Sequence, residues 1–296
     1  MAQMSMFDGG NGGGDGGGEG PPAAAPAPAP APTGGPEWMV GTWNVNSVRV
    51  RLEHLRRVLV EYRPDVLCLQ ETKVVDADFP RAALEDLGYH VEVFGQKTYN
   101  GVAILSTRPI TDVTRGFTGA GDEEQKRLLA GTVGGVRIVN GYFPNGGSVD
   151  SERFEDKLRF FADLKAYLAA RHDPAQPLVL TGDFNVAPAP EDVHDPEGLD
   201  GSICYHPRER EALEDLRGWG FTDLFRQFNR EGAQYSWWDY REGAFARNAG
   251  YRIDHIFTTA PLSSAATWCH IEKEERALER ASDHVPVLAA FSGALD

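Results

Sequence analysis

Several residues that could do chemistry stand at the ends of predicted strands in this chain. They comprise four carboxylates, two amides and one imidazole: Glu71, Asp183, Asp254, Asp283, Asn44, Asn185 and His284. Polar side chains at strand ends can converge on one rim of a sheet. Gathering so many acidic groups would be costly unless a cation or a substrate compensated their charge. The pattern therefore predicts one polar site at a sheet edge.

Oxygen ligands of this kind favour a hard divalent ion, Mg²⁺ or Mn²⁺ as its substitute, over zinc. Such an ion, with a histidine and an Asp/Asn pair, can activate water for attack on phosphorus. Taken singly, each residue also has an ordinary structural interpretation, because an Asp after a strand is commonly a turn former or a helix cap. The same holds for histidines, and we interpret all of them except His284 as structural, His255 included. Only the joint occurrence at strand boundaries favours catalysis.

Alternating strands and helices from Glu37 onward must position these side chains. A helix with Ser47 as its N-cap carries Leu52, Leu55, Leu59 and Tyr62 at helical spacing. A second helix spans about 151–171, with apolar residues on one face. Strands are expected at 38–44, 66–69, 101–106, 130–132, 136–143, 178–182, 252–258 and 285–291. The body therefore fits one large α/β domain or two similar layered halves.

The first 36 residues differ in composition from the rest of the chain. They hold 11 of the 33 glycines and 7 of the 19 prolines. This Gly/Pro/Ala-rich segment cannot bury enough apolar surface to offset its chain entropy, so we expect a disordered tail. The net charge of the chain is −15, of which the tail contributes only three acidic residues. The acidic body argues against a protein that coats nucleic acid non-specifically, since such binding needs basic residues on phosphates.

Local patches of basic charge remain compatible with this balance. Residues 205–252 contain eight Arg and eight Asp/Glu, and 11 of the 30 aromatic residues of the chain. Arginine interleaved with aromatic residues can grip phosphates and stack on sugars or bases. The alternative is a core-forming segment with solvated arginines, and Trp219 and Phe221 are expected in the core.

The sequence lacks the features of a membrane-spanning, secreted or disulfide-rich protein. No run approaches the roughly 18 apolar residues of a spanning helix, and the N-terminus has no apolar core preceded by positive charge, as a secretory signal would. Three cysteines without a CxxC pair favour neither a disulfide framework nor a zinc site. We therefore expect a cytoplasmic protein with no membrane partner. We also expect it to be a monomer.

Seven motifs in this order carry a resemblance to a known family: Thr42-Trp43-Asn44-Val45-Asn46-Ser47, Leu69-Gln70-Glu71-Thr72-Lys73, Gly141-Tyr142-Phe143-Pro144-Asn145-Gly146, Gly182-Asp183-Phe184-Asn185, Tyr235-Ser236-Trp237-Trp238-Asp239-Tyr240-Arg241, Arg252-Ile253-Asp254 and Ser282-Asp283-His284. The chain resembles the exonuclease III group of abasic-site endonucleases, within the DNase I-like endonuclease/exonuclease/phosphatase superfamily. The resemblance covers 38–292 and implies a four-layered α/β sandwich, with two packed mixed β-sheets flanked by helices. It also implies that 37–296 form the catalytic domain.

The resemblance implies roles for the polar residues. Glu71 would be the main metal ligand, with Asn44 beside it and Asp283 near a second metal position. Asp183 would orient or deprotonate the attacking water, helped by Asn185. The remaining members of the set would hold the scissile phosphate: His284, fixed by Asp254, together with Tyr142 and Asn145. The division of labour among Asp183, Tyr142 and His284 is left open.

The resemblance also implies how DNA is held. Trp237, Tyr251 and Ile253 would wall a pocket for a base-free deoxyribose turned out of the duplex, since a limited apolar volume selects a sugar that lacks its base. Four basic residues match phosphate-contacting positions of similar proteins: Arg241, Arg127, Lys97 and Lys157. The partner would be double-stranded DNA with abasic sites or blocked 3′ ends.

Three functions compete at this point. The first is a DNA repair nuclease that cuts 5′ to abasic sites, with 3′→5′ exonuclease and 3′-phosphatase activity whose balance is left open. The second is a phosphatase of inositol phosphates or lipids, against which stand the SWWDYR segment and the lack of a membrane-binding run. The third is a catalytically silent DNA-binding relative, which should have lost one of Glu71, Asp183, Asn185 or His284. All four are present.

Overall fold

The computed structural model describes residues 37–117 and 125–295 of the chain. The predicted disordered tail, 1–36, lies outside the described residues. Within them, two six-stranded mixed sheets pack face to face. The first has the order β13 (Ala266–Ile271), β14 (Val287–Ser292), β1 (Glu37–Asn44), β2 (Val66–Gln70), β4 (Val102–Ser106) and β3 (His90–Phe94). The second has the order β5 (Thr111–Arg115), β6 (Leu128–Val133), β7 (Val136–Tyr142), β8 (Leu178–Asp183), β12 (Asp254–Thr258) and β9 (Thr222–Asp223).

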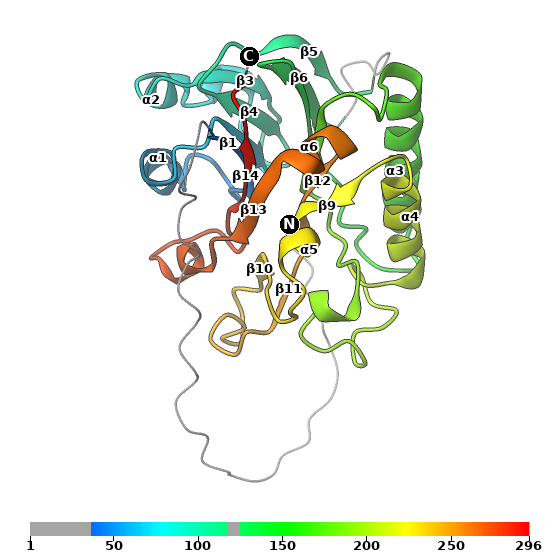
Figure 1. Cartoon of the computed structure of the whole chain (residues 1–296). Helices are drawn as coiled ribbons and strands as arrows, with labels where there is room; N and C mark the ends of the chain where they lie inside the picture. The colour runs from blue at the N-terminus through cyan, green and yellow to red at the C-terminus, as the bar shows by residue number, and fades with distance from the viewer. Residues whose placement is uncertain (1–36, 118–124, 296) are drawn as a thin grey trace. The chain divides into compact units, whose positions relative to one another are not determined.

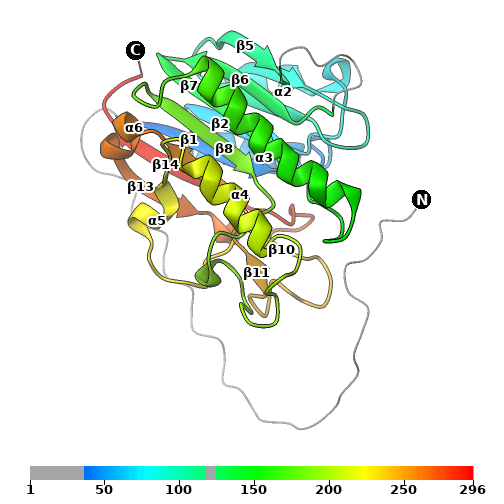
Figure 2. The ribbon, with the colours of Figure 1, turned by 90° about the vertical axis from the view of Figure 1, so that its right-hand side faces the viewer.

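Helices complete the outer layers. The outer layers are formed by α1 (Leu52–Glu61), α2 (Arg81–Glu85), α3 (Glu152–Arg171) and α4 (Pro207–Arg217). Two short helices, α5 (Leu224–Phe228) and α6 (Ala260–Ala265), contribute buried residues to the cluster between the sheets. Figures 1 and 2 show α1 and α2 beside the first sheet, and α3 and α4 side by side along the outer face of the second. Short 3₁₀ turns occupy Asp76–Asp78, Pro190–Asp192 and Lys273–Ala277, and β10 (Trp237–Trp238) pairs with β11 (Gly250–Tyr251).

Three apolar layers hold this stack together. Residues such as Val40, Ile104 and Ile138 fill the space between the two sheets. A second cluster packs α3 and α4 onto the outer face of the second sheet, and a third packs α1 and α2 onto the first sheet. Because each sheet buries both faces, β2, β4, β8 and β12 read as continuously buried runs. The predicted four-layered α/β sandwich is confirmed.

The two long predicted helices form, but one predicted cap is wrong. Helix α3 begins where expected, because the Ser151 hydroxyl accepts a hydrogen bond from the backbone N–H of Phe154 at 3.3 Å. Helix α1 instead begins at Leu52, and Ser47 has a positive φ of 87°. The backbone N–H of Ser47 donates to the carbonyl oxygen of Glu71 at 2.8 Å. This segment therefore braces the turn after β2 rather than opening the helix.

Strand register brings site residues into rows. Tyr142 and Asp254 are the register partners of Asp183 on its two neighbouring strands. Gly141 and Gly182 are also register partners, and a Cβ on Gly182 would lie 1.8 Å from the Gly141 carbonyl oxygen. Only glycine permits this approach, so the pair sets how closely β7 and β8 end together.

Candidate active site

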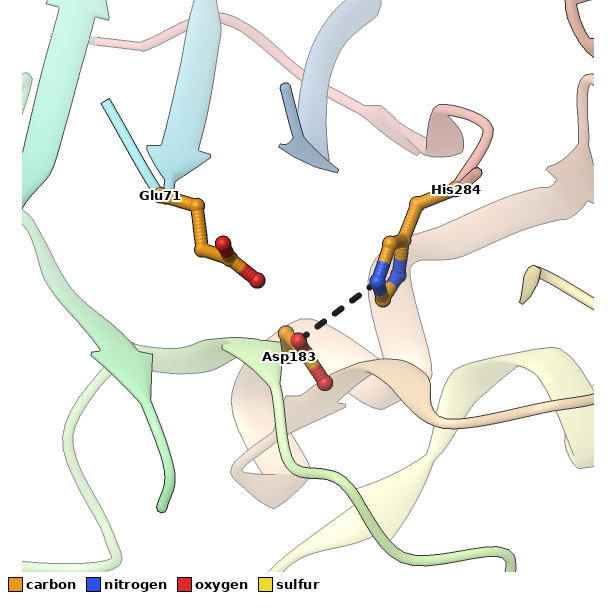
Figure 3. A group of neighbouring side chains, drawn as sticks. All are labelled: Glu71, Asp183 and His284. Atoms are coloured by element: carbon orange, nitrogen blue, oxygen red, sulfur yellow. Dashed lines mark ion pairs between the residues drawn. The ribbon is translucent and has the colours of Figure 1, made fainter. Parts of the chain in front are cut away.

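The ends of strands from both sheets meet at one rim. Asn44 and Asp183 are the last residues of β1 and β8, Glu71 follows β2, and Asp254 begins β12. Ligand atoms of Glu71, Asp183 and His284 all lie within 4.8 Å of one another. Figure 3 shows the three side chains pointing into the same space from different elements. The predicted convergence of these residues is therefore what the structure shows.

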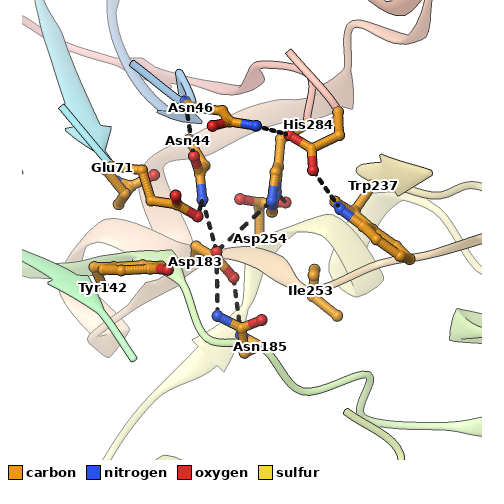
Figure 4. Close-up of polar contacts among 12 residues, drawn as sticks. Asn44, Asn46, Glu71, Tyr142, Asp183, Asn185, Trp237, Ile253, Asp254 and His284 are labelled. Atoms are coloured by element: carbon orange, nitrogen blue, oxygen red, sulfur yellow. Dashed lines mark hydrogen bonds and ion pairs between the residues drawn. The ribbon is translucent and has the colours of Figure 1, made fainter. Parts of the chain in front are cut away.

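Asn44 links the two acidic residues nearest the centre. Its Nδ2 donates to Glu71 Oε1 at 2.9 Å and to Asp183 Oδ2 at 2.9 Å, while its Oδ1 accepts from the backbone N–H of Asn46. An amide can hold two carboxylates in this way without adding charge. Figure 4 shows Asn44 lying between the two carboxylates.

His284 is oriented by a buried chain of hydrogen bonds. Its Nδ1 lies 2.9 Å from Asp254 Oδ2, and the Ser236 hydroxyl donates to that same oxygen at 2.6 Å. Burial alone would lower the pKa of His284, but Asp254 and Asp183 outweigh it and raise the pKa to about 10. The imidazole is therefore charged at neutral pH, with Nε2 facing Asp183 Oδ2 at 3.8 Å.

Asp183 has the properties of a proton acceptor. Burial raises its pKa to about 7, since the partners that favour its charged form, chiefly His284 and Asn44, compensate only in part. Asn185 contacts it twice, through its backbone N–H to Oδ1 at 2.9 Å and its Nδ2 to Oδ2 at 3.3 Å. A carboxylate with a pKa near the working pH is suited to general base catalysis.

Tyr142 and Asn145 flank the same space. Burial, and then Glu71, raise the pKa of Tyr142 well above its usual value, so its hydroxyl keeps its proton and can donate it in a hydrogen bond. The Arg127 guanidinium lies 4.7 Å from the centre of the Tyr142 ring. Asn145 Nδ2 donates to Asn185 Oδ1 at 3.1 Å. All the residues predicted to hold the phosphate therefore border the cluster.

The residues present fit a hard divalent cation. Burial would raise the pKa of Glu71, but Lys73 and Asn44 lower it, so the carboxylate is ionised. Lys73 Nζ lies 2.7 Å from Glu71 Oε2. Asp254 Oδ1 is buried without a hydrogen-bond partner among the described residues. Ionised, oxygen-rich groups in excess over their basic partners are the donor set that Mg²⁺ or Mn²⁺ prefers.

Asp283 lies outside this group of ligand atoms. Its Oδ1 accepts from Asn46 Nδ2 at 2.9 Å and its Oδ2 from Trp237 Nε1 at 3.1 Å. Both oxygens are therefore engaged in fixing neighbouring side chains. A role for Asp283 near a second metal stays a prediction.

The three residues predicted to wall a sugar pocket do come together. The Trp237 and Tyr251 rings meet edge to face, with centroids 5.5 Å apart. Tyr251 and Ile253 belong to a buried apolar cluster against which Trp237 packs. The Trp237 ring centroid is also 6.5 Å from that of His284, which places this apolar wall beside the polar cluster.

The four residues predicted to contact phosphates differ in their exposure and in their distance from the site. Arg127 lies at the site, Lys97 is exposed, and Arg241 is exposed and paired with Asp239. Lys157 is wrong as a DNA contact, because its side chain is completely buried and pairs with the equally buried Glu209. An ammonium sealed beneath the surface cannot reach a phosphate of bound DNA.

Comparison with known proteins decides the family. A model of the endonuclease/exonuclease/phosphatase family matches residues 41–284. The chain belongs to this family. An exodeoxyribonuclease III of Haemophilus influenzae is 36% identical over 266 residues, covering 84% of this chain and 98% of the relative.

Solved structures agree with this assignment. An AP endonuclease from Archaeoglobus fulgidus shares 38% identity with a TM-score of 0.83, and covers 86% of this chain and 100% of its own. A 3′ phosphatase from Neisseria, bound to a product DNA hairpin, shares 43% identity with a TM-score of 0.83 and the same coverage. The predicted family, fold and nuclease class of enzyme are therefore confirmed.

Three residues of this family member that position the site escaped the sequence analysis. Lys73 neutralises Glu71, Asn46 binds Asp283, and Ser236 holds Asp254. All three lie inside the motifs given for the resemblance, but no role had been assigned to them there.

No helix of the described residues combines the length and apolarity needed to cross a membrane.

Proposed function

We propose that this protein is a DNA repair nuclease that hydrolyses the phosphodiester bond 5′ to an abasic site in double-stranded DNA. We propose in addition that it removes nucleotides and phosphates from blocked 3′ ends, because relatives with these named activities align over nearly all of the described residues. The observation that carries the proposal is a charged imidazole and a carboxylate with a pKa near 7 beside one another at an apolar wall.

The residues of the site fall into two groups, one that activates the water and one that binds the phosphate. Asp183 accepts a proton from water, which Asn185 orients through its amide. The water oxygen attacks phosphorus, and the bond from phosphorus to the 3′ oxygen breaks. The departing 3′ oxygen takes a proton from solvent and becomes a 3′ hydroxyl. His284, Tyr142 and Asn145 hold the phosphate oxygens, and the positive imidazole stabilises the charge that develops on them.

Glu71, with Asn44 beside it, would hold Mg²⁺, or Mn²⁺ in its place. When bound, such an ion supplies a Lewis acid that draws charge from the phosphate oxygens. Its presence also offsets the negative charge that Glu71 and Asp183 bring to the rim. A role for Asp283 near a second ion belongs to this proposal.

The substrate is selected by shape at the wall of Trp237, Tyr251 and Ile253. Their apolar surfaces would accept a deoxyribose without its base, whereas a normal nucleotide is bulky and costly to unstack. Arg127, Lys97 and Arg241 would contact flanking phosphates. We expect the protein to act as a monomer in the cytosol or on the nucleoid.

One assay tests the proposal. Purified protein is incubated with a duplex that carries a single tetrahydrofuran site, with Mg²⁺ or with EDTA, beside the same duplex without the lesion. Metal-dependent incision at the lesion supports the proposal. Hydrolysis of only small phosphoesters such as inositol phosphates would indicate a phosphatase, and binding without product a silent relative.

A further inference from the structure

Lys157 lies in the second turn of α3, and its side chain contacts the site loops that carry Asn145 and Asn185. Its side chain and that of Glu209, in α4, are both fully buried. The ammonium donates to the backbone carbonyl oxygen of Asn185 at 2.7 Å and to that of Asn145 at 3.2 Å, and pairs with Glu209. All three of its hydrogen atoms therefore have acceptors.

The two carbonyl groups belong to the same two residues whose side chains meet above. Asn145 Nδ2 donates to Asn185 Oδ1 at 3.1 Å, and Asn185 contacts Asp183. The Cys204 sulfur lies 3.7 Å from Asn145 Nδ2 and 3.9 Å from Asn185 Oδ1. The two asparagines are thus held together on both their backbone and side-chain sides.

Local packing admits the lysine beneath the loop. A Cβ built on Gly146 would lie 3.2 Å from Lys157 Cδ, and Gly146 has a φ of 96°. Glycine at this position therefore both turns the loop and leaves room for the lysine stem.

We propose that Lys157 is a positioning residue for phosphodiester hydrolysis, which fixes Asn145 and Asn185 relative to each other, with Glu209 compensating its charge. This inference rests on the proposed function for the roles of the two asparagines. Stability alone does not account for the pair, because a buried ion pair can often be replaced by apolar side chains without loss of stability. The ammonium instead ties a phosphate-holding residue to a water-orienting one.

The decisive experiment replaces both partners. Lys157→Met alone leaves Glu209 buried without its partner, so it should lower the melting temperature. In the double variant Lys157→Met/Glu209→Leu we expect the melting temperature to recover only in part. The buried charge is gone, but the carbonyl oxygens of Asn145 and Asn185 lose their donor, and the backbone N–H of His206 loses Glu209 Oε2 as its acceptor. We expect kcat to stay about 10- to 100-fold low and KM to change less than about threefold, because misplaced groups act on the transition state.

A matched control comes from the same two helices. Lys165 of α3 pairs with Asp215 of α4 at 2.6 Å, but both side chains are exposed. The double variant Lys165→Met/Asp215→Leu should leave both the melting temperature and kcat close to those of the wild type. Wild-type kcat in the folded buried double variant would overturn the proposal.

A second variant decides the matter if the buried double variant does not fold. Glu209→Gln removes the acidic charge but leaves the Lys157 nitrogen on both carbonyl oxygens, so kcat should fall less than about threefold. A loss as large as that of Lys157→Met would show that only the ion pair matters, and would refute the positioning role.

Cysteine alkylation separates this proposal from the proposed function. Iodoacetamide labelling mapped by peptide mass should modify Cys204 faster in Lys157→Met/Glu209→Leu than in the wild type, while the buried Cys68 and Cys269 serve as internal controls. Unchanged Cys204 labelling would contradict the loosening of the loops. If the wild type does not cut abasic DNA, the proposed function fails, but this measurement still tests whether Lys157 holds the two asparagines.

Discussion

Two buried clusters of charge in this protein differ in how their charges balance. The first, here called the arginine cluster, consists of Arg252, Arg226, Asp192 and Asp223, so its two positive and two negative groups cancel. The second, the catalytic cluster, consists of Glu71, Asp183, Asp254 and His284, with Lys73 in contact. Three carboxylates there meet two basic groups, and Oδ1 of Asp254 has no hydrogen-bond partner within the part of the chain that the structure describes.

The balance is visible in the pKa of the buried aspartates. Burial would raise the pKa of Asp223, but the charge and the hydrogen bond of Arg252 lower it below its usual value. Burial, and after it the neighbouring carboxylates of Asp254 and Glu71, raise the pKa of Asp183 to about 7, although His284 lowers it. A balanced cluster stabilises ionised side chains, whereas an unbalanced one leaves a carboxylate able to exchange a proton near neutral pH.

The two histidines show the same contrast. His255 lies against Arg252, with Nδ1 at 3.0 Å from the guanidinium, and its Nε2 donates to the Val186 carbonyl oxygen. Burial, and then Arg252, lower its pKa to about 3, so it is neutral, whereas the pKa of His284 is raised to about 10. Burial lowers the pKa of both histidines, so the difference between them follows from the sign of the nearby charge: Arg252 beside His255, and Asp254 and Asp183 beside His284.

Among these predictions, Asp183→Asn should cause the largest change in turnover. We expect kcat on the abasic duplex to fall about 10²-fold or more, since the variant cannot accept the proton of water. The melting temperature should stay level or rise, because the amide removes a charge from an acidic cluster. Loss of DNA binding to the same extent as loss of turnover would mean that Asp183 is a structural carboxylate.

The corresponding change in the arginine cluster should act on stability instead. Asp192→Asn leaves Arg252 and Arg226 short of a negative partner, so we expect the free energy of unfolding to fall by about 3–5 kcal/mol. Urea denaturation measures this loss. The kcat of the folded protein should change less than about threefold, and a much larger drop would erase the distinction between the two clusters.

A smaller effect is expected at the hydroxyl that supports the imidazole. Ser236 donates to Asp254 and accepts from the backbone N–H groups of Ile253 and Asp254. Ser236→Ala should lower kcat about tenfold by releasing Asp254 and His284, while Ser236→Thr keeps the hydroxyl and should restore most of it. Equal losses in both variants would point to packing rather than to the hydrogen bond.

The smallest expected effect is a change in how the free energy of unfolding depends on pH when His255 is replaced. Its folded pKa, about 3, is below its usual 6.5, so the unfolded state takes up a proton first as the pH falls. The stability that this neutral imidazole contributes is therefore complete above about pH 6.5 and is lost progressively toward pH 3. Urea unfolding between about pH 6.5 and 5 should show a shallower pH slope for His255→Gln than for the wild type. Identical slopes would show that His255 does not titrate in this way.

Several elements of the fold could be predicted from the sequence. The apolar runs that end at Gln70 and Asp183 are buried on both faces, so their continuous hydrophobicity predicted central strands. By contrast β3, β5 and β13 alternate in burial or are partly exposed, and the sequence analysis did not predict them. Edge strands carry a weak pattern because only part of each is covered.

Lys157 shows why part of the site was misassigned. It follows Phe154 by three residues and precedes Phe161 by four, so it shares the buried face of α3. That spacing already indicated a buried lysine, but the identity of its acceptors did not follow from it. Glu209 and the two asparagine carbonyls come from separate segments that only the folded chain brings together.

The order and type of motifs in the sequence by themselves determined the family, the layered α/β class and the set of acidic, amide and imidazole groups. Local patterns suffice for this, because strand ends and their polar residues are neighbours in the chain. Tertiary structure alone decided the protonation of each group, since a pKa depends on charges that arrive from distant segments. His255 and His284 have the same side chain, and the sign of the charge packed against each gives them opposite behaviour.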